Sequence, residues 1–489
     1  MTDAAVVGSG PNGLAAAVVL ARAGLSVTLY EAASTIGGGA RTEELAPDHL
    51  HDLCSAVHPM AVASPFFREF QLQRRIEFAV PEISYAHPLD GGRAGVAFRD
   101  LTRTVEGLGQ DGRAYRRLME PLVRNIEGTL DVALNHLLRI PRHPAATARF
   151  GLAALDQGTH LWNRRFSTDV AAALFTGVAA HPVGTLPSLP SAGAGLALGA
   201  LAHAGGWPIP LGGSQSIADS MAQDLLAHGG KIVTDHTIDS LSELSGVPTV
   251  LLDVAPPSLI RLAAGRLPRT YERALERFRF GDGACKVSFI LSGPVPWSNP
   301  EVARAGTVHL GGTRAEIAAS EANVAAGFHP ENPYVLLSQP SLFDPSRAPA
   351  GRHILWTYCH VPSGSTRDMA EAVTAQIERF APGFRDVVVS TFTTTAADLA
   401  ASNANYVGGD FGGGAVTLGQ MLARPVLSPA PWRTPLDGVY LCSASTPPGP
   451  GVHGMAGYHA ARLALREVFG LAAPALGVDT GTTTSFPTG

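Results

Sequence analysis

Three glycines near the amino terminus stand at the spacing that a dinucleotide-binding loop requires. The loop reads Gly8-x-Gly10-x-x-Gly13, with Pro11 and Asn12 between the last two glycines, and it follows a short apolar segment. In such a loop the first glycine permits a tight turn and the second lets the backbone approach a pyrophosphate. The third lets the following helix pack closely on the strand. That helix would direct free N–H groups and the positive end of its dipole at the phosphates.

An acidic residue stands where the second strand of this unit should end. Gly24 closes the apolar helix, Ser26–Tyr30 is expected to form a strand, and Glu31 follows it. A carboxylate at that position can bind ribose hydroxyls. Strand, loop, helix, strand and acid together predict a site for an adenine dinucleotide rather than a chance glycine-rich turn. These residues are compatible with NAD as well as with FAD.

Two further glycine-rich segments are expected near the ligand. Gly37–Thr42 (GGGART) is predicted to be a flexible, positively charged loop that folds back over the dinucleotide. Near the carboxyl terminus, an expected strand at Gly438–Cys442 leads through a loop without bulky side chains to a helix expected at Val452–Phe469. The helix N-terminus after Gly451 can stabilise negative charge on a ligand, and an ordinary packing loop is the alternative.

Two histidines are candidates for acid–base chemistry. His58 ends the segment LHDLCSAVHP, and His453 stands at the expected start of the last helix. An imidazole titrates near neutral pH, so either could orient a substrate or act as a base. The alternative for each is a hydrogen-bonded structural side chain, and His51 and Asp52, which could pair, are expected to be structural. No HxxxH, HExxH or GxSxG pattern occurs, which argues against metal catalysis and against a serine hydrolase.

Composition indicates a globular protein. Of 489 residues, 45% are hydrophobic and 16% charged, and the formal net charge of −5 suggests no nucleic-acid surface. The four cysteines lie far apart with no CxxC pair, which argues against a redox dithiol. No apolar run reaches the about 18 residues that span a bilayer. The nearest, Ala192–Ala204, fits a buried helix or a channel wall better. We expect a cytoplasmic protein without a signal peptide.

The order of the elements predicts an α/β fold with a Rossmann-type domain that is discontinuous in sequence. Alternating helix and strand patterns at 205–265 and 400–472 are expected to join 1–75 in this domain. The stretches 76–204 and 266–399 are expected to form an inserted α+β substrate-binding domain.

Local patterns refine this division. Residues 114–149 show a helical spacing of leucines, interrupted by prolines towards the end. Cys285–Leu291, Tyr334–Ser338 and His353–Tyr358 alternate as antiparallel strands do. Residues 473–489, rich in Gly, Thr, Ala and Pro, are expected to be a disordered tail.

Five segments together resemble the phytoene desaturase-like flavoproteins, which belong to the wider FAD-dependent amine oxidase superfamily. They read GSGPNG, GGGARTEE, HDLCSAVHP, GGWPIPLGGSQSIADSMAQDLLAHGGKI and GVYLCSASTPPGPGVHGMAGYHAA. The resemblance runs over nearly the whole chain. It implies a non-covalently held FAD, a discontinuous FAD domain and an inserted substrate domain, with no metal.

The resemblance also implies roles for single residues. The glycine loop should contact the pyrophosphate, Glu31 the ribose, and Ile238 the adenine, while Ser445 and the start of the last helix should meet the flavin. The implied cofactor-binding set is Gly8, Gly10, Pro11, Asn12, Gly13, Glu31, Gly38, Gly39, Arg41, Ile238, Ser445, Gly451, Val452, His453 and Met455. Many relatives read Gly-Gly-Arg-x-x-Thr, whereas Arg41 comes two residues later here. The phosphate contact of Arg41 is therefore left open.

The function implied is that of an FAD-dependent desaturase or dehydrogenase that takes a hydride from a C–H bond of a small apolar substrate, such as a carotenoid-like polyene or another isoprenoid. No second GxGxxG follows a strand, so the electron acceptor is expected to be oxygen, a quinone or another diffusible molecule. The alternatives are a flavin amine oxidase, a redox-neutral isomerase and, least favoured, a non-catalytic flavin-binding scaffold. Peripheral membrane contact through residues 190–204 is left open, and no oligomeric state is predicted.

Overall fold

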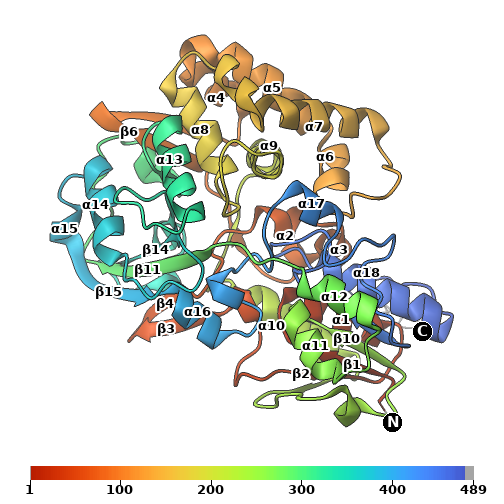
Figure 1. The fold of residues 1–489 in the computed structure, drawn as a ribbon. Coiled ribbons are helices and arrows are strands. Elements are labelled where there is room, and N and C mark those ends of the chain that lie inside the picture. The colour runs from red at the N-terminus through yellow and green to blue at the C-terminus, as the bar shows by residue number, and fades with distance from the viewer. Residues whose placement is uncertain (1, 479–489) are drawn as a thin grey trace, which may run out of the picture.

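A five-stranded parallel sheet carries the two ends and the middle of the chain (Figure 1). The computed structural model describes residues 2–478, and the sheet has the order β16-β10-β1-β2-β9, with every neighbouring pair parallel. Its strands are β1 (Ala4–Val7), β2 (Val27–Tyr30), β9 (Lys231–Val233), β10 (Thr249–Leu252) and β16 (Val439–Leu441). The predicted Rossmann-type sheet is therefore confirmed.

Helices cover both faces of this sheet, as a parallel sheet requires. Successive side chains of β1 point to opposite faces, so Ala4 and Val6 pack in one core and Ala5 and Val7 in another. The first face is covered by α1 (Pro11–Arg22), α10 (Gln215–Ala227) and α18 (Met455–Ala464). The second face is covered by α11 (Pro256–Ala263) and α12 (Arg269–Glu276).

A second, seven-stranded mixed sheet has the order β15-β11-β14-β13-β12-β6-β7. Its neighbours run antiparallel except for β12 and β6, which are parallel. The strands are β6 (Ile83–Leu89), β7 (Arg93–Phe98), β11 (Gly283–Leu291), β12 (Ala305–Leu310), β13 (Val335–Ser338), β14 (His353–Val361) and β15 (Val388–Thr394). The three antiparallel strands expected from the alternation are among them.

The faces of the mixed sheet are also covered by helices. Val287 and Phe289 of β11 pack in one core with Ile377 and Phe384, which α14 and α15 contribute. The helices on this side and beside the sheet are α13 (Arg314–Ala325), α14 (Ala370–Phe380), α15 (Phe384–Val387) and α16 (Ala396–Ser402). Figure 1 shows α14 and α15 on the side away from the Rossmann-type sheet.

A layer of helices lies over the opposite side of the mixed sheet. It comprises α4 (Leu101–Gly107), α5 (Gly112–Arg124), α6 (Ile126–Ala133), α7 (Pro144–Gln157), α8 (Asp169–Ala179) and α9 (Leu189–Ala204). The helical pattern at 114–149 is thus divided among three helices, and Pro144 begins a helix rather than breaking one, because its missing N–H costs nothing at the first position. α9, seen end-on in Figure 1, is buried along most of its length.

The remaining short elements connect the two sheets. β3 (Thr42–Ala46) pairs with β4 (His49–Asp52), and β5 (Phe78–Ala79) pairs with β8 (Ile209–Pro210). α2 (Pro59–Ala63), α3 (Pro65–Glu69) and α17 (Leu418–Leu422) complete the fold. Every strand of the parallel sheet falls in 1–75, 205–265 or 400–472, and the boundaries themselves stay a prediction.

Two expectations about the ends of the structure need correction. The last helix begins at Met455, with Gly454 before it, and not at Val452, because Gly454 takes a left-handed conformation. Within the tail expected from residue 473, Leu476 is buried in the core around α1, so the stretch 473–478 is packed on the protein. Residues 479–489 lie outside the described residues. None of the helices within 2–478 is both long and apolar enough to cross a membrane.

Candidate functional site

The loop between β1 and α1 has the conformation that its glycines allow. Gly8 has a φ of +98°, in the left-handed region, and its N–H donates to the Tyr30 carbonyl at 2.8 Å. A Cβ on Gly13 would lie 2.0 Å from the Gly8 carbonyl oxygen, so α1 can lie this close to β1 only because residue 13 has no side chain. The loop therefore presents bare backbone at the amino-terminal end of α1.

Glu31 connects this loop to the end of β2. Its Oε2 accepts from the Ser9 N–H and its Oε1 from the Ala33 N–H, each at 2.9 Å. These bonds hold the carboxylate beside the glycine loop, where it lines a large cavity. The geometry is compatible with the ribose contact that the sequence predicts.

The second glycine segment lies directly against the first. A Cβ on Gly38 would be 3.0 Å from the Gly10 Cα, so the two loops touch through bare backbone. Residues 38–40 form a short 3-10 turn instead of the flexible loop that the sequence predicted. Arg41 donates to the Thr35 carbonyl at 2.5 Å and lies 3.4 Å from Glu31, and its buried Nε has no partner.

One cavity of about 940 Å³ unites the predicted residues. Its wall includes Gly8, Gly10, Pro11, Asn12, Glu31, Gly38, Gly39, Arg41, His58, Ile238, Ser445, Gly451 and Val452. Gly13, His453 and Met455 are not part of this wall. Residues from four distant parts of the chain therefore meet around a single space.

The cavity wall suits a dinucleotide. A Cβ on Gly10 would lie 2.7 Å from the Asp253 Oδ2, so a side chain at residue 10 would displace the Asp253 carboxyl from the first turn of α1. The buried Nε of Arg41 and the Oδ1 of Asn12 lack partners, and both side chains line the cavity. Unpaired buried polar atoms are costly, and a polar ligand at this position would satisfy them.

Asp253 is a buried carboxylate that the sequence reasoning did not single out. It follows β10, and its Oδ2 accepts from the Gly13 N–H at 2.9 Å, inside the first turn of α1. Burial, with a smaller contribution from the charge of Glu31, raises the pKa of Asp253 to about 7. One signal in the sequence could have found it. Asp253 directly follows the apolar strand Thr249–Leu252, and parallel strands of this fold end beside the glycine loop.

We predict that Asp253→Asn reduces the loss of stability with rising pH. The folded chain keeps this carboxyl protonated up to about pH 7, whereas an ordinary carboxyl ionises near 3.8. Stability from the group is thus present at low pH and is lost as the pH rises through this window. The melting temperature of the variant should exceed that of the wild type by a few degrees at pH 8, with a smaller difference at pH 4.5.

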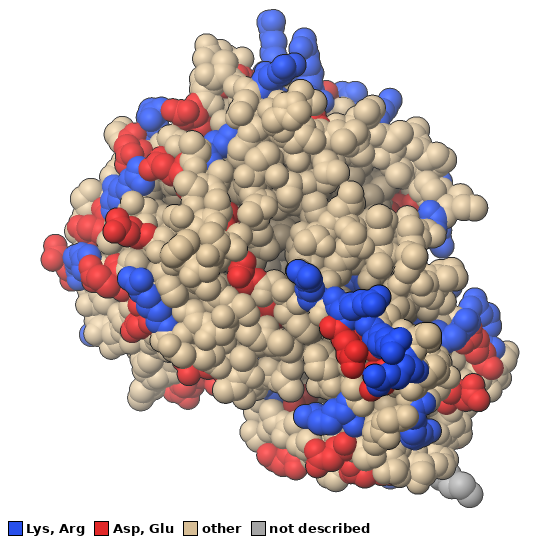
Figure 2. Space-filling view, in the orientation of Figure 1, with Lys and Arg blue, Asp and Glu red and all other residues tan. Residues whose placement is uncertain are grey.

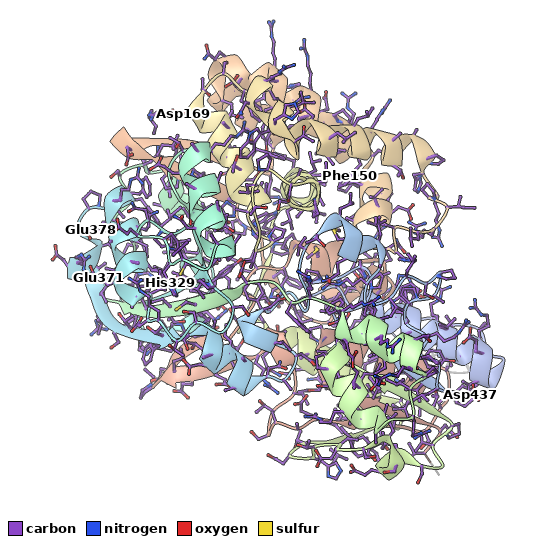
Figure 3. All side chains as sticks on the ribbon, viewed as in Figure 1. Phe150, Asp169, His329, Glu371, Glu378 and Asp437 are labelled. Atoms are coloured by element: carbon purple, nitrogen blue, oxygen red, sulfur yellow. The ribbon has the colours of Figure 1, made fainter. Side chains whose placement is uncertain are left out.

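The matched control is Asp437→Asn, whose carboxylate is exposed near the surface end of the Rossmann-type sheet (Figure 3). Melting curves for both variants across pH 4.5–8 measure the effect. If the melting temperatures of Asp253→Asn and of the wild type changed with pH in parallel, the raised pKa of Asp253 in the folded chain would be contradicted.

His58 lines the cavity as a neutral imidazole. The Ser214 hydroxyl donates to the Ser55 carbonyl at 2.6 Å, so it must accept from the His58 Nε2–H at 2.7 Å, and Nδ1 keeps its lone pair. Burial lowers the pKa of His58 to about 4. Asp52 accepts from the Ser214 N–H at 2.8 Å and pairs with Arg347 at 2.7 Å, so it does not pair with His51.

His453 was expected to face the ligand from a helix start, and the structure places it elsewhere. Its Nδ1 accepts from the Met455 N–H at 3.0 Å and its Nε2 contacts the Gly449 carbonyl at 3.2 Å. Both ring nitrogens are thus used by the backbone of the loop before α18, and burial lowers the pKa of His453 to about 4. This geometry favours the structural alternative, in which His453 shapes the loop.

A buried arginine supports the loop at the expected flavin end. Arg424 donates to the carbonyls of Ala444 at 3.0 Å and Gly412 at 2.9 Å, while the Ser445 hydroxyl donates to the Gly413 carbonyl at 2.8 Å. Arg424 lines the cavity, and burial lowers its pKa to about 10. A positive charge here can stabilise negative charge on a ligand.

An aromatic wall, which sequence reasoning missed, faces the middle of the cavity. Trp356 and Tyr358 of β14 meet at 5.4 Å between ring centroids, and Tyr358 meets Phe411 at 5.2 Å. All three line the cavity together with Trp207. Because alternate residues of β14 point to one face of the sheet, Trp356 and Tyr358 act as a pair that only the strand geometry reveals.

Lys286 of β11 stands directly opposite Tyr358 in the sheet register. Its Nζ donates to Ser288 at 2.5 Å, the side chain is buried, and burial lowers the pKa of Lys286 to about 8. Lys286 itself is not among the residues that line the cavity. The chain has only one other lysine, Lys231, and this scarcity was the available signal.

The far arm of the cavity is apolar. It is bounded by α6, α7 and α9, whose contributions to the wall include Phe150, Gly193, Ala197 and Leu198. Figure 3 shows Phe150 between α7 and α9. The expectation that 192–204 is a buried helix is confirmed for most of its residues.

Among residues 2–478, no group of three or more His, Cys, Asp and Glu side chains is arranged to hold a metal ion. The cysteines in this range are all free.

Comparison with known proteins extends these observations. A family model described as an NAD(P)-binding Rossmann-like domain matches residues 6–70. The chain is 26% identical to pyridine nucleotide-disulfide oxidoreductase domain-containing protein 2 of Rattus norvegicus, over 95% of this chain and 94% of the relative.

Solved structures share the fold. Putrescine oxidase with bound putrescine is 18% identical, with a TM-score of 0.58 over 95% of this chain and 98% of its own. Cyclohexylamine oxidase from Brevibacterium oxydans is 16% identical, with a TM-score of 0.55 over 95% and 99%. The chain therefore has the two-domain fold of the flavin amine oxidase type, with a Rossmann-like sheet and a separate mixed sheet.

Proposed function

We propose that this chain is an FAD-dependent oxidoreductase that takes a hydride from a C–H bond of an apolar substrate. The observation that carries the proposal is the single cavity that runs from the glycine loop, past the aromatic wall, into the apolar helical arm. A dinucleotide site joined to an apolar chamber places a cofactor and a substrate in one water-poor space.

Named residues would hold the cofactor. The backbone of the glycine loop and the Arg41 Nε would meet the pyrophosphate, Glu31 the ribose, and Ile238 the adenine. Ser445 and the Gly451–Val452 segment would lie at the flavin, with Arg424 as the nearby positive charge. FAD, when bound, supplies the acceptor for the hydride.

The remaining residues would position the substrate and exclude water. Trp356, Tyr358 and Phe411 form flat apolar surfaces in the cavity, and His58 offers the Nδ1 lone pair as a proton acceptor. The low pKa of His58 keeps it neutral at physiological pH.

The substrate class follows from the helical arm and the resemblance. An arm bounded by Phe150, Ala197 and Leu198 favours an extended hydrocarbon, and the likeness to phytoene desaturase-like flavoproteins points to a carotenoid or another isoprenoid. Oxygen or a quinone would be the electron acceptor.

A flavin amine oxidase is the second candidate. The aromatic wall favours it, and the two oxidases that share the fold act on amines according to their names. The acidic residues of the cavity wall, Glu31, Asp253 and Asp410, each accept bonds from backbone N–H groups. The wall residues that α6, α7 and α9 contribute include no acidic side chain, so the helical arm offers no carboxylate to an ammonium group and the apolar substrate is preferred.

Gly10→Ala should abolish retention of FAD. The added Cβ would meet the Asp253 Oδ2 at 2.7 Å and would enter the space in front of α1. Purified wild type should be yellow and release FAD on denaturation, whereas the variant should retain at least tenfold less flavin. Gly107→Ala is the control, because a Cβ there meets nothing within 4 Å. Colourless wild-type protein that does not bind added FAD would overturn the proposed function.

Gly193→Leu should distinguish the two substrate classes. Gly193 lies on α9 in the cavity wall, and a Cβ added there would be 3.6 Å from the Phe150 ring. A leucine at this position would therefore narrow the helical arm, and the glycine loop would be left unchanged. With a long polyene the KM should rise at least tenfold, while the flavin content stays unchanged. Gly107→Leu is the matched control.

The readout is anaerobic bleaching of the flavin by candidate substrates, followed by reoxidation with oxygen or a quinone. Bleaching by small amines with release of hydrogen peroxide, equal in wild type and Gly193→Leu, would favour the amine oxidase instead. Turnover that requires reduced flavin but shows no net electron transfer would indicate an isomerase. If no substrate reduced the flavin and no acceptor reoxidised it, the chain would be a flavin-binding scaffold.

A further inference from the structure

Six exposed aliphatic side chains gather on the segment between α6 and α7, on α7 itself and on α17. We call this group the apolar rim. Ile140 is 92% exposed and Leu152 67% exposed, values that the hydrophobic effect disfavours in an isolated chain. The rim consists of Leu137, Leu138, Ile140, Leu152, Leu155 and Leu418.

The apolar rim surrounds one end of the cavity. Leu137, Leu155 and Leu418 belong to the cavity wall and are also exposed to solvent, so the helical arm opens between them. His136 donates a hydrogen bond to the backbone carbonyl of Leu422, which connects the segment after α6 with α17. In Figure 1 this segment runs beside α17 before it enters α7.

The charges beside the rim that have no ion-pair partner are basic, because Asp131 pairs with Arg139 and Asp156 pairs with Arg165. The sequence from 134 to 152, LNHLLRIPRHPAATARFGL, contains Arg139, Arg142 and Arg149 and no acidic residue. Arg139 pairs with Asp131 at 2.5 Å, whereas Arg142 and Arg149 are exposed and have no ion-pair partner within the described residues. Figure 2 shows few charged side chains on the surface over α7 and α17.

We propose that the apolar rim docks on the surface of an anionic lipid bilayer, with the cavity opening into it. Exposed aliphatic side chains would enter the boundary between headgroups and acyl chains, while Arg142 and Arg149 meet anionic headgroups. An apolar substrate then passes between bilayer and cavity without crossing water. This last step rests on the proposed function, whereas the docking itself does not.

A bilayer fits this surface better than a second copy of the chain. In a two-fold dimer the same patch meets itself, so the unpaired arginines of one copy would approach those of the other. The neighbouring acids, Asp131 and Asp156, are already paired with Arg139 and Arg165. A lipid surface offers many negative charges and needs no matching shape.

The test is co-sedimentation of the full-length protein with vesicles. One set of vesicles is pure phosphatidylcholine, and in the other about a third of the lipid is anionic phosphatidylglycerol. The wild type should bind the anionic vesicles at least tenfold more tightly. Added salt should weaken the binding. The double variant Ile140→Ser/Leu152→Ser should lose at least tenfold in binding, and Arg142→Gln/Arg149→Gln should lose the preference for the anionic lipid.

The matched control is Leu226→Ser/Phe328→Ser, which removes two side chains that are 54% and 65% exposed but lie on α10 and after α13. This variant should bind vesicles as the wild type does. Equal loss in the control, or no vesicle binding by the wild type, would overturn the proposal. So would a wild-type dimer in size-exclusion chromatography that Ile140→Ser/Leu152→Ser converts to a monomer, because the rim would then be a protein interface.

Flavin content and the oxidation of detergent-dispersed substrate separate this proposal from the proposed function. Both should be unchanged in Ile140→Ser/Leu152→Ser, because its side chains lie outside the glycine loop and the aromatic wall. Vesicle binding by a chain that retains no flavin would uphold the docking and overturn the oxidoreductase.

Discussion

The close approach of α1 to its neighbours is the constraint on which the rest of the structure depends. A Cβ at Gly13 would lie 2.0 Å from the Gly8 carbonyl, and a Cβ at Gly457 would lie 1.8 Å from the Asn12 carbonyl. Glycine at both positions lets α1 pack between β1 and α18 with backbone against backbone. The amino-terminal end of α1 is then fixed at the carboxyl ends of the parallel strands, where α/β folds bind their ligands.

Once α1 is fixed, distant segments complete the cavity around its first turn. Asp253 accepts the Gly13 N–H, Gly38 touches Gly10, and the loop before α18 supplies Ser445 and Gly451. The mixed sheet contributes Trp356 and Tyr358 of the aromatic wall through β14. Cofactor site and substrate chamber are thus parts of one space, since the carboxyl ends of the parallel strands and one face of the mixed sheet border it.

The cavity also relates the interior of the molecule to its surface. At one end lie charged and backbone groups suited to phosphates, and at the other Leu137 and Leu155 belong both to the wall and to the exposed rim. Such a gradient from polar to apolar along one space is what a hydride-transfer enzyme for water-insoluble molecules requires. Under the two proposals, the same helical arm serves as chamber and as entrance.

Local patterns in the chain were sufficient for the parallel sheet, the glycine loop and the role of α9 as a buried helix, because these depend on residue spacing within about thirty positions. They were insufficient for Asp253, Arg424, Lys286 and the aromatic wall, since each acquires its significance from contacts that only the folded chain makes. His453 shows the same limit: a histidine beside a helix start looks like a ligand, yet Gly454 delays the helix and both ring nitrogens turn to the loop. The surroundings of those side chains depend on burial and on the pairing of distant strands, and neither can be read from the order of the residues alone.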